Sequence, residues 1–346
     1  MNNKARFINY FILLLVAGFC LGACHSKKGA EKGSKHKNGV WVNPRRGKIF
    51  TKKNVIEIPL TAMELHIVGK VKWVRYKDFE VAKRGNDSRR VLVDSGYNVY
   101  NEAGYLINQN EYDSAGKLKY NCIYTYDDKN KAVEWNYTDN YYKKFSSKTT
   151  FRYDEKGNKA EEIWVGIDPK FSRKGVYKYD EKGKVTEMST TSKDGKLNRL
   201  ETYKYDSRGN ETEISEWAGN GTLVVKRTAR YDDKGNNVEG NYYISDTLHP
   251  AKEVMKYDNN GWCTQYDTYL RDGKLDSKTT IKYDEWGSYI EYLKYKSNGV
   301  LNDEWCWYTQ YEYDKEGNVT KQTVYRMEKG KKVITGTREA AYAYYE

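Results

Sequence analysis

The stretch Tyr153-Asp154-Glu155-Lys156-Gly157-Asn158 decides the fold of this 346-residue chain, because its key residues return at a fixed interval. Tyr-Asp recurs every 26 residues, and a glycine follows each aspartate three positions later. A fixed period of this length is typical of repeat architectures. The six copies are Tyr153, Asp154, Gly157; Tyr179, Asp180, Gly183; Tyr205, Asp206, Gly209; Tyr231, Asp232, Gly235; Tyr257, Asp258, Gly261; and Tyr283, Asp284, Gly287.

The array extends outward to Tyr126-Asp127, to a Tyr100-Asn101 variant and to Tyr313-Asp314, which gives a repeat region over residues 99–330. In each copy the aspartate can accept hydrogen bonds from the turn backbone, while glycine takes the left-handed conformation. A second mark keeps the same period: Asp168, Asp194, Asn220, Asp246, Asp272 and Asn298. Four of these precede glycine, and Asp-Gly or Asn-Gly predicts a tight hairpin with positive φ at both central positions.

Each repeat therefore reads as two strands and two turns, and the fold class is all-β. We expect tandem antiparallel β-hairpins that form one long twisted or spiral sheet. Residues two before each motif tyrosine share its face and are mostly apolar: Tyr124, Phe151, Tyr177, Tyr203, Ala229, Met255, Ile281 and Tyr311. The opposite face should carry rows of cations one residue before the tyrosine and of glutamates eight after it, which predicts mutually neutralising ladders. Residues 54–98 should form an N-terminal β cap and residues 331–346 a closing strand.

The N-terminus predicts export. Lys4 and Arg6 precede an apolar run over residues 11–22, which is shorter than the roughly 20 residues that span a bilayer. The run leads into Leu21-Gly22-Ala23-Cys24, which resembles a bacterial lipobox. We expect a signal peptide over residues 1–23, lipidation of Cys24 and residence at the outer membrane.

The positive charge is concentrated beside that anchor. The first 24 residues carry +2 and residues 25–53 carry +9, which leaves +1 of the net +12 for residues 54–346. Residues 24–53 thus read as a basic flexible tether, which is either a solvated spacer or a segment whose partner is the anionic membrane surface. A nearly neutral exported body argues against nucleic acid as a partner.

Catalytic and metal-binding patterns are missing from the sequence. Cys122, Cys263 and Cys306 are scattered and form neither a disulfide framework nor metal spacing. No nucleophile elbow, phosphate loop or zinc motif occurs. We therefore expect a non-enzymatic protein without cofactor or metal.

The motif resembles the YD repeats of Rhs-type proteins and, more nearly, the exported YD-repeat lipoproteins of Bacteroidetes, which open with a segment like Gly69-Lys70-Val71-Lys72. The resemblance covers residues 68–330 and implies a spiral β-sheet that encloses cargo or displays binding surfaces. The chain departs from the Rhs pattern by a longer period, a shorter array and the lack of a separate C-terminal toxin domain.

The function expected is a binding or scaffold surface in the cell envelope, with a protein as partner. Two alternatives are a carbohydrate-binding protein that stacks sugars on Tyr and Trp rings, and an immunity or accessory protein of an Rhs-like toxin. The period stretches from 26 to 30 between Tyr283 and Tyr313, beside the densest aromatic cluster. The predicted ligand-binding residues are Trp305, Trp307, Tyr308 and Trp286.

Overall fold

The structure, a computed structural model, describes residues 36–37, 40–42, 49–51, 67, 69–84, 87–244, 251–328 and 330–346. The predicted signal peptide, Cys24 and most of the tether lie outside these residues. Within the tether, three short strands pair antiparallel: β1 (His36–Lys37), β2 (Val40–Val42) and β3 (Ile49–Thr51). Across the part of the chain that is described, no helix has the length and apolar character to cross a membrane.

The all-β prediction is confirmed, and the strands fall into two compact units. The larger unit comprises residues 31–200, 218–221 and 309–346. Its strands are β4 (Val71–Arg84), β5 (Asp87–Tyr100), β6 (Leu106–Asp113), β7 (Leu118–Tyr126), β8 (Ala132–Asp139), β9 (Ser147–Tyr153), β10 (Lys159–Gly166), β11 (Arg173–Tyr179), β12 (Val185–Ser192), β22 (Val319–Glu328) and β23 (Lys331–Tyr344). Two 3₁₀ turns, η1 (Lys143–Phe145) and η2 (Pro169–Phe171), interrupt its loops.

The smaller unit comprises residues 201–217 and 222–308 together with the N-terminal 30 residues, which are outside the described part. It contains β15 (Leu223–Tyr231), β16 (Asn237–Ile244), β17 (Lys252–Tyr257), β18 (Cys263–Tyr269), β19 (Leu275–Tyr283), β20 (Tyr289–Lys296) and the 3₁₀ turn η3 (Asp303–Trp305). Residues of both units contribute to β13 (Leu197–Tyr205), β14 (Glu211–Ala218) and β21 (Trp307–Tyr313).

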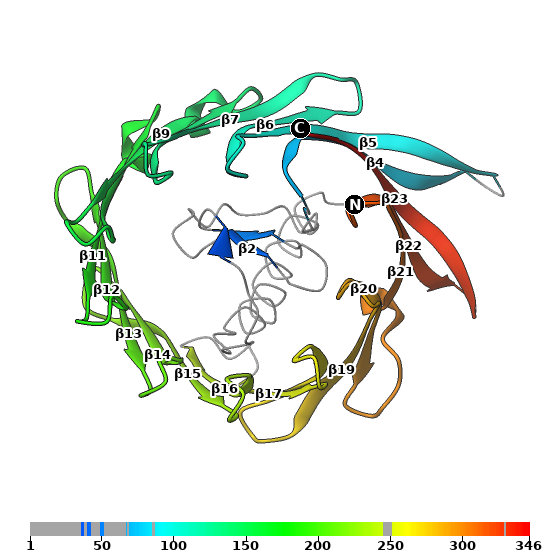
Figure 1. Ribbon diagram of the computed structural model, residues 1–346. Helices are drawn as coiled ribbons and strands as arrows, with labels where there is room; N and C mark the ends of the chain where they lie inside the picture. The colour runs from blue at the N-terminus through cyan, green and yellow to red at the C-terminus, as the bar shows by residue number, and fades with distance from the viewer. Residues whose placement is uncertain are drawn as a thin grey trace. The chain divides into compact units, whose positions relative to one another are not determined.

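Successive strands pair antiparallel, and the C-terminal strand pairs with the first long strand. In the larger unit β23 runs beside β4 (Figure 1), with a register from Gly336 opposite Glu80 to Tyr344 opposite Val71. The hydrogen-bonded strand order, from β4 to β23 and back to β4, is that of a closed barrel. The expectation of a spiral sheet is therefore wrong, because the strand order returns to its first member. The cap and the closing strand satisfy each other's edge groups and are not free edges.

In the Tyr-Asp turns the aspartate side chain accepts backbone hydrogen bonds and the glycine adopts the left-handed conformation. At Asp154 the side-chain Oδ1 accepts from the Asn158 N–H at 2.7 Å, and the Gly157 N–H donates to the Asp154 carbonyl at 2.9 Å. Gly157 has φ +83°. A side chain at this φ is strained. An added Cβ would also come within 2.3 Å of the Lys131 ammonium, so both conformation and space favour glycine here.

The Asp-Gly and Asn-Gly turns differ from the expected type. Gly195, Gly221, Gly273 and Gly299 have φ near +80°, but Asn130 is the one non-glycine with positive φ among the described residues. These turns therefore have a single left-handed position, followed by a register shift such as that at Trp217 opposite Leu223. The prediction of two positive φ values is wrong, because a glycine bulge replaces the two-residue turn.

Two positions of the second repeated series, Asp168 and Asp246, are not followed by glycine. Asp168 precedes η2, where its side chain accepts from the Lys170 N–H. Asp246 lies outside the described residues.

The motif tyrosines tie each repeat to the preceding one. In six repeats the tyrosine hydroxyl donates to a backbone carbonyl about one repeat back in the chain, with an oxygen–oxygen distance of 2.7 Å. The pairs are Tyr126–Leu106, Tyr153–Ala132 and Tyr179–Lys159 in the larger unit, and Tyr231–Glu211, Tyr257–Asn237 and Tyr283–Cys263 in the smaller unit. The tyrosine therefore contributes an inter-repeat hydrogen bond as well as ring packing.

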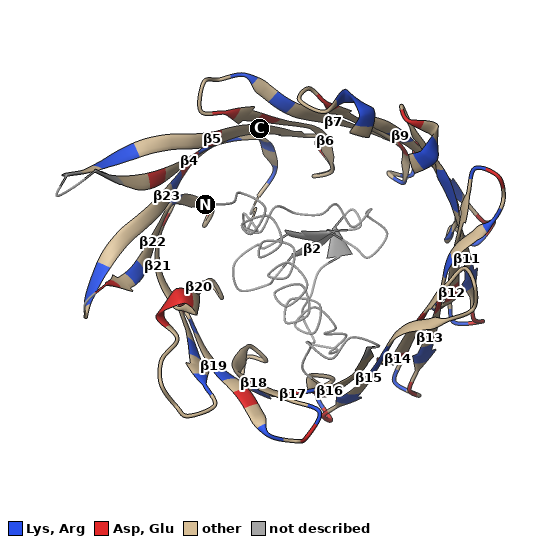
Figure 2. Cartoon of the chain, turned by 180° about the vertical axis from the view of Figure 1, so that it is seen from behind, with Lys and Arg blue, Asp and Glu red and all other residues tan. Residues whose placement is uncertain are grey.

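The two faces of the sheet have different chemistry. On the face of the motif tyrosines, called the tyrosine face, Tyr124, Phe151, Met255 and Ile281 are buried. The opposite face carries the charge ladders, because their residues alternate along each strand with those of the tyrosine face. Figure 2 shows cationic and acidic positions distributed along the strands. Glutamates lie directly across from the cations, as in Lys178–Glu187 at 2.7 Å, Lys204–Glu213 at 2.9 Å, Arg230–Glu239 at 3.2 Å and Lys282–Glu291 at 2.8 Å.

Candidate functional site

The loop that breaks the 26-residue period places Trp307 on the tyrosine face and Trp305 in the 3₁₀ turn before it. Trp307 begins β21 and lies opposite Tyr292 of β20. Their ring centroids are 4.0 Å apart and the rings are parallel to within 1°. Trp305 ends η3, and the Lys294 ammonium lies 5.6 Å from its ring centroid. The loop therefore assembles a half-buried aromatic cluster with a cation at its side.

Cys306, between the two tryptophans, anchors this loop to β20. Its side chain is fully buried. The sulfhydryl donates to the Asn302 carbonyl at 3.1 Å, and its sulfur accepts from the Lys294 N–H at 3.3 Å. Burial raises the pKa of the Cys306 thiol. Cys122 and Cys263 are likewise buried free thiols. Cys306 is thus a packing residue that holds the tryptophans in place.

The other two predicted ligand residues lie elsewhere. Tyr308 is opposite Glu291, on the charged face, where Glu291 pairs with Lys282. Trp286 lies in the Tyr-Asp turn that precedes β20, where its backbone N–H donates to the Asp284 carboxylate at 2.8 Å. That turn is at the opposite end of β20 from Lys294. The structure therefore places Trp305 and Trp307 beside the same end of β20, against Lys294 and Tyr292, and separates Trp286 and Tyr308 from them.

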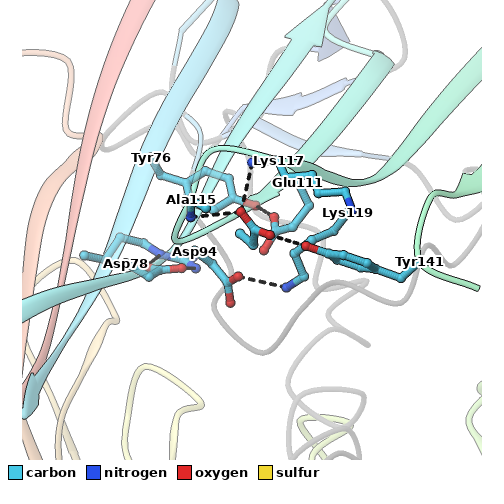
Figure 3. A network of polar contacts seen from close by, with 10 residues as sticks. Tyr76, Asp78, Asp94, Glu111, Ala115, Lys117, Lys119 and Tyr141 are labelled. Atoms are coloured by element: carbon cyan, nitrogen blue, oxygen red, sulfur yellow. Dashed lines mark hydrogen bonds and ion pairs between the residues drawn. The ribbon is translucent and has the colours of Figure 1, made fainter.

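A polar cluster that sequence reasoning missed lies on the tyrosine face of the larger unit (Figure 3). The Tyr76 hydroxyl donates to Glu111 Oε2 at 2.5 Å, and both side chains are buried. Arg338 donates twice to Asp78, at 2.5 Å for each bond, and its guanidinium lies 4.5 Å from the Tyr76 ring centroid. The cluster therefore joins β4, β6 and β23.

The Tyr76–Glu111 pair is both buried and tightly packed. Desolvation raises the pKa of Glu111, against the opposing effect of the hydrogen bond from Tyr76. Gly96 lies opposite Tyr76, and a Cβ added there would come within 2.1 Å of the tyrosine ring. Nearby, Lys119 pairs with Asp94 at 2.9 Å. Glu111 breaks the repeat pattern, and periodicity therefore gave no signal for it.

The smaller unit has a comparable buried carboxyl. Glu253 accepts from the hydroxyls of Tyr242, at 2.6 Å, and Tyr266. Burial raises its pKa as well. Glu253 on β17 is held by tyrosines of its two neighbouring strands, β16 and β18, whereas Glu111 on β6 is held by Tyr76 of β4, on the far side of β5. Both arrangements cross-link strands. Within the described residues, no cluster of three His, Cys, Asp or Glu side chains could hold a metal ion.

Comparisons with known proteins assign no family. No protein-family model matches the chain, and no curated protein matches it. A porin-like protein from Bacteroides uniformis ATCC 8492 is similar in structure at 13% identity and TM-score 0.34, over 79% of this chain and 98% of that one. The Photorhabdus luminescens Tc holotoxin pore gives 11% identity and TM-score 0.36, over 71% and 15% of the two chains. A TcdB2–TccC3–Cdc42 structure gives 14% and 0.32, over 81% and 18%. This chain thus spans less than a fifth of either toxin chain.

Proposed function

We propose that this protein is an exported, lipid-anchored binding or scaffold protein of the cell envelope, without enzymatic activity, whose Trp305–Trp307 cluster binds a protein partner. The observation that carries the proposal is that both rings lie beside one end of β20, Trp305 near Lys294 and Trp307 stacked on Tyr292, in the loop that departs from the repeat. Aromatic side chains on a rigid support are the residues that dominate protein interfaces.

The rest of the repeat supports this proposal. Motif tyrosines donate to backbone carbonyls, and glutamates pair with cations across the ladder. These groups are engaged in holding the sheet together, whereas Trp305 and Trp307 stand in a loop that departs from the repeat and keep part of their surface exposed. A sheet braced in this way holds its rings in place, so little ordering is needed on binding.

The test is a pull-down from envelope extract with the full chain in mild detergent. Bound protein is identified by mass spectrometry and bound carbohydrate by sugar analysis. We expect one protein in fixed proportion, lost from a Trp305→Ala/Trp307→Ala variant and retained by Trp286→Ala. Trp286 is the matched control because it lies at the other end of β20.

The outcomes separate the alternatives. Carbohydrate retained by the full chain without protein, and lost in the double variant, would replace the protein partner with a glycan at the same rings. Retention by the double variant at the level of the full chain would reject the tryptophan site.

A further inference from the structure

The turns at the two ends of strands β9–β12 differ in polarity, and each set of turns is called an edge here. At one edge, the Tyr-Asp turns over residues 154–158 and 180–184 present the charged side chains of Glu155, Lys156, Glu181 and Lys182. At the other edge, the loops over residues 140–146 and 167–172 are longer and contain η1 and η2. The Tyr-Asp turns at the first end are therefore called the polar edge, and the loops at the second end contain fewer charged and more apolar residues.

That second edge exposes large apolar side chains. Tyr142 is 64% exposed, Phe145 44%, Ile167 65% and Phe171 39%. The rings of Phe145 and Phe171 lie 5.6 Å apart, and those of Tyr142 and Phe145 lie 6.1 Å apart. These four residues form one patch across the two loops, called the apolar edge.

Backbone bonding holds the two loops beside each other. The Ile167 N–H donates to the Ser146 carbonyl at 2.9 Å, and Ser146 is buried. The Gly166 N–H donates to the Ser172 hydroxyl at 3.2 Å. The exposed rings therefore project from fixed turns.

Around the first loop of the apolar edge, the acid is hydrogen-bonded within the loop and the lysines are exposed. Asp139 accepts from the N–H groups of Tyr141 and Tyr142, at 2.9 and 2.7 Å, so its carboxylate is engaged within the loop. The Lys144 ammonium lies 5.1 Å from the Phe145 ring centroid. Lys143 is exposed beside them.

The second loop repeats this arrangement. The Lys170 ammonium lies 4.9 Å from the Phe171 ring centroid. The one acid of this loop, Asp168, accepts from the Lys170 N–H at 3.2 Å and pairs with the Lys170 ammonium at 3.0 Å. Both loops thus set a lysine beside an exposed phenylalanine, with their acids bound locally.

We propose that the apolar edge docks on an anionic membrane surface. Aromatic and aliphatic side chains enter the headgroup boundary, and lysines at their sides extend toward the lipid phosphates. Charge complementarity favours this occupant, because the loop acids are engaged within the loops while Lys143 and Lys144 remain exposed around the rings. The inference is independent of the Trp305–Trp307 site.

Hydrogen exchange on the full chain reconstituted with vesicles tests the docking. Vesicles of phosphatidylglycerol and phosphatidylethanolamine are compared with vesicles of phosphatidylcholine. We expect exchange in residues 140–146 and 167–172 to slow about tenfold on the anionic vesicles, because docking suppresses local opening of these loops. Exchange in residues 154–158 and 180–184, on the polar edge, should stay unchanged.

A Phe145→Ser/Ile167→Ser variant should lose the protection, and Phe145→Trp/Ile167→Leu should keep it. Both changes are at exposed positions, so the thermal unfolding midpoint serves as the folding control. Equal protection at both edges, or none at either, would overturn the proposal. Protection that appears only when envelope protein is added, and not with lipid, would assign the patch to a protein partner instead.

Discussion

The Tyr153 hydroxyl donates a hydrogen bond of 2.7 Å to the carbonyl oxygen of Ala132, which lies 21 residues earlier at the start of β8. Tyr153 also ends β9 immediately before its own turn. One side chain thus connects the turn of its repeat to the first strand residue of the preceding repeat. Recurrence of the same bond in both units explains why the motif uses tyrosine rather than phenylalanine.

Replacing Tyr153 by Phe should lower the free energy of unfolding by about 1 kcal/mol, because a half-buried hydrogen bond is lost while the ring remains. Urea unfolding monitored by circular dichroism measures the change. Tyr142→Phe is the control, because Tyr142 is exposed, and it should leave stability unchanged. Equal stability of Tyr153→Phe and the unmodified chain would mean that the bond is replaced by water at no cost.

Glycine in the Tyr-Asp turn should be required for its backbone conformation. Gly183 has φ +72°, and an added Cβ would meet nothing closer than 3.7 Å. Gly183→Ala should therefore cost about 1–2 kcal/mol from the left-handed conformation alone, and Gly183→Asn should cost less. Gly240→Ala is the matched control, since its Cβ also has space and its φ is not positive. Equal costs at the two positions would contradict this explanation.

Glu213 is the centre of one rung of the charge ladder, with Lys204 and Lys226 each at 2.9 Å. Its hydrogen bonds to these lysines hold its pKa below the ordinary value. Glu213→Gln should cost no more than about 1 kcal/mol, because Lys204 is well exposed and solvent screens the pair. The cost should fall as salt rises, measured by urea unfolding at low and high sodium chloride. A larger cost that does not depend on salt would point to packing instead.

The features that repeat could be predicted from the sequence. The 26-residue period, the tyrosine face and the cation–glutamate rows depend on residues a few positions apart in a strand or across one turn. The second turn type was wrong because Asp194-Gly195 fits both a two-residue turn and a longer turn with a glycine bulge, and only the backbone separates them. The Trp305–Trp307 pair was signalled by the stretched period.

Contacts between distant segments gave no such signal. Arg338 and Asp78 are 260 residues apart, and their pairing depends on β23 lying beside β4. Neither strand carries the Tyr-Asp motif, so nothing in the repeat indicated that they pair. Trp286 and Tyr308 were grouped with the tryptophan pair by sequence proximity. The strand alternation then placed Tyr308 on the other face, and the length of β20 separated Trp286 from the pair.

The buried carboxyl of Glu111 should give the protein a pH dependence of opposite sign to that of the ladder. Burial raises the pKa of Glu111 above its ordinary value, so the folded state favours the protonated form. Stability from this group is complete below the unfolded pKa and is lost as pH rises through the folded pKa. Glutamine does not ionise, so the Glu111→Gln variant does not lose stability in this way as pH rises. Its stability relative to the unmodified chain should rise by up to about 1.4 kcal/mol per pH unit within this window and then level off.

Urea unfolding of both proteins at a series of pH values from acid to neutral measures this difference. Glu161→Gln is the control with the reverse sign, because Lys174 at 2.6 Å lowers the pKa of Glu161. Stability from Glu161 is present above the unfolded pKa and is lost as pH falls, so the cost of Glu161→Gln should shrink in acid. If the Glu111→Gln difference stays flat or declines as pH rises, Glu111 is ionised in the folded protein and its hydrogen bond from Tyr76 outweighs its burial.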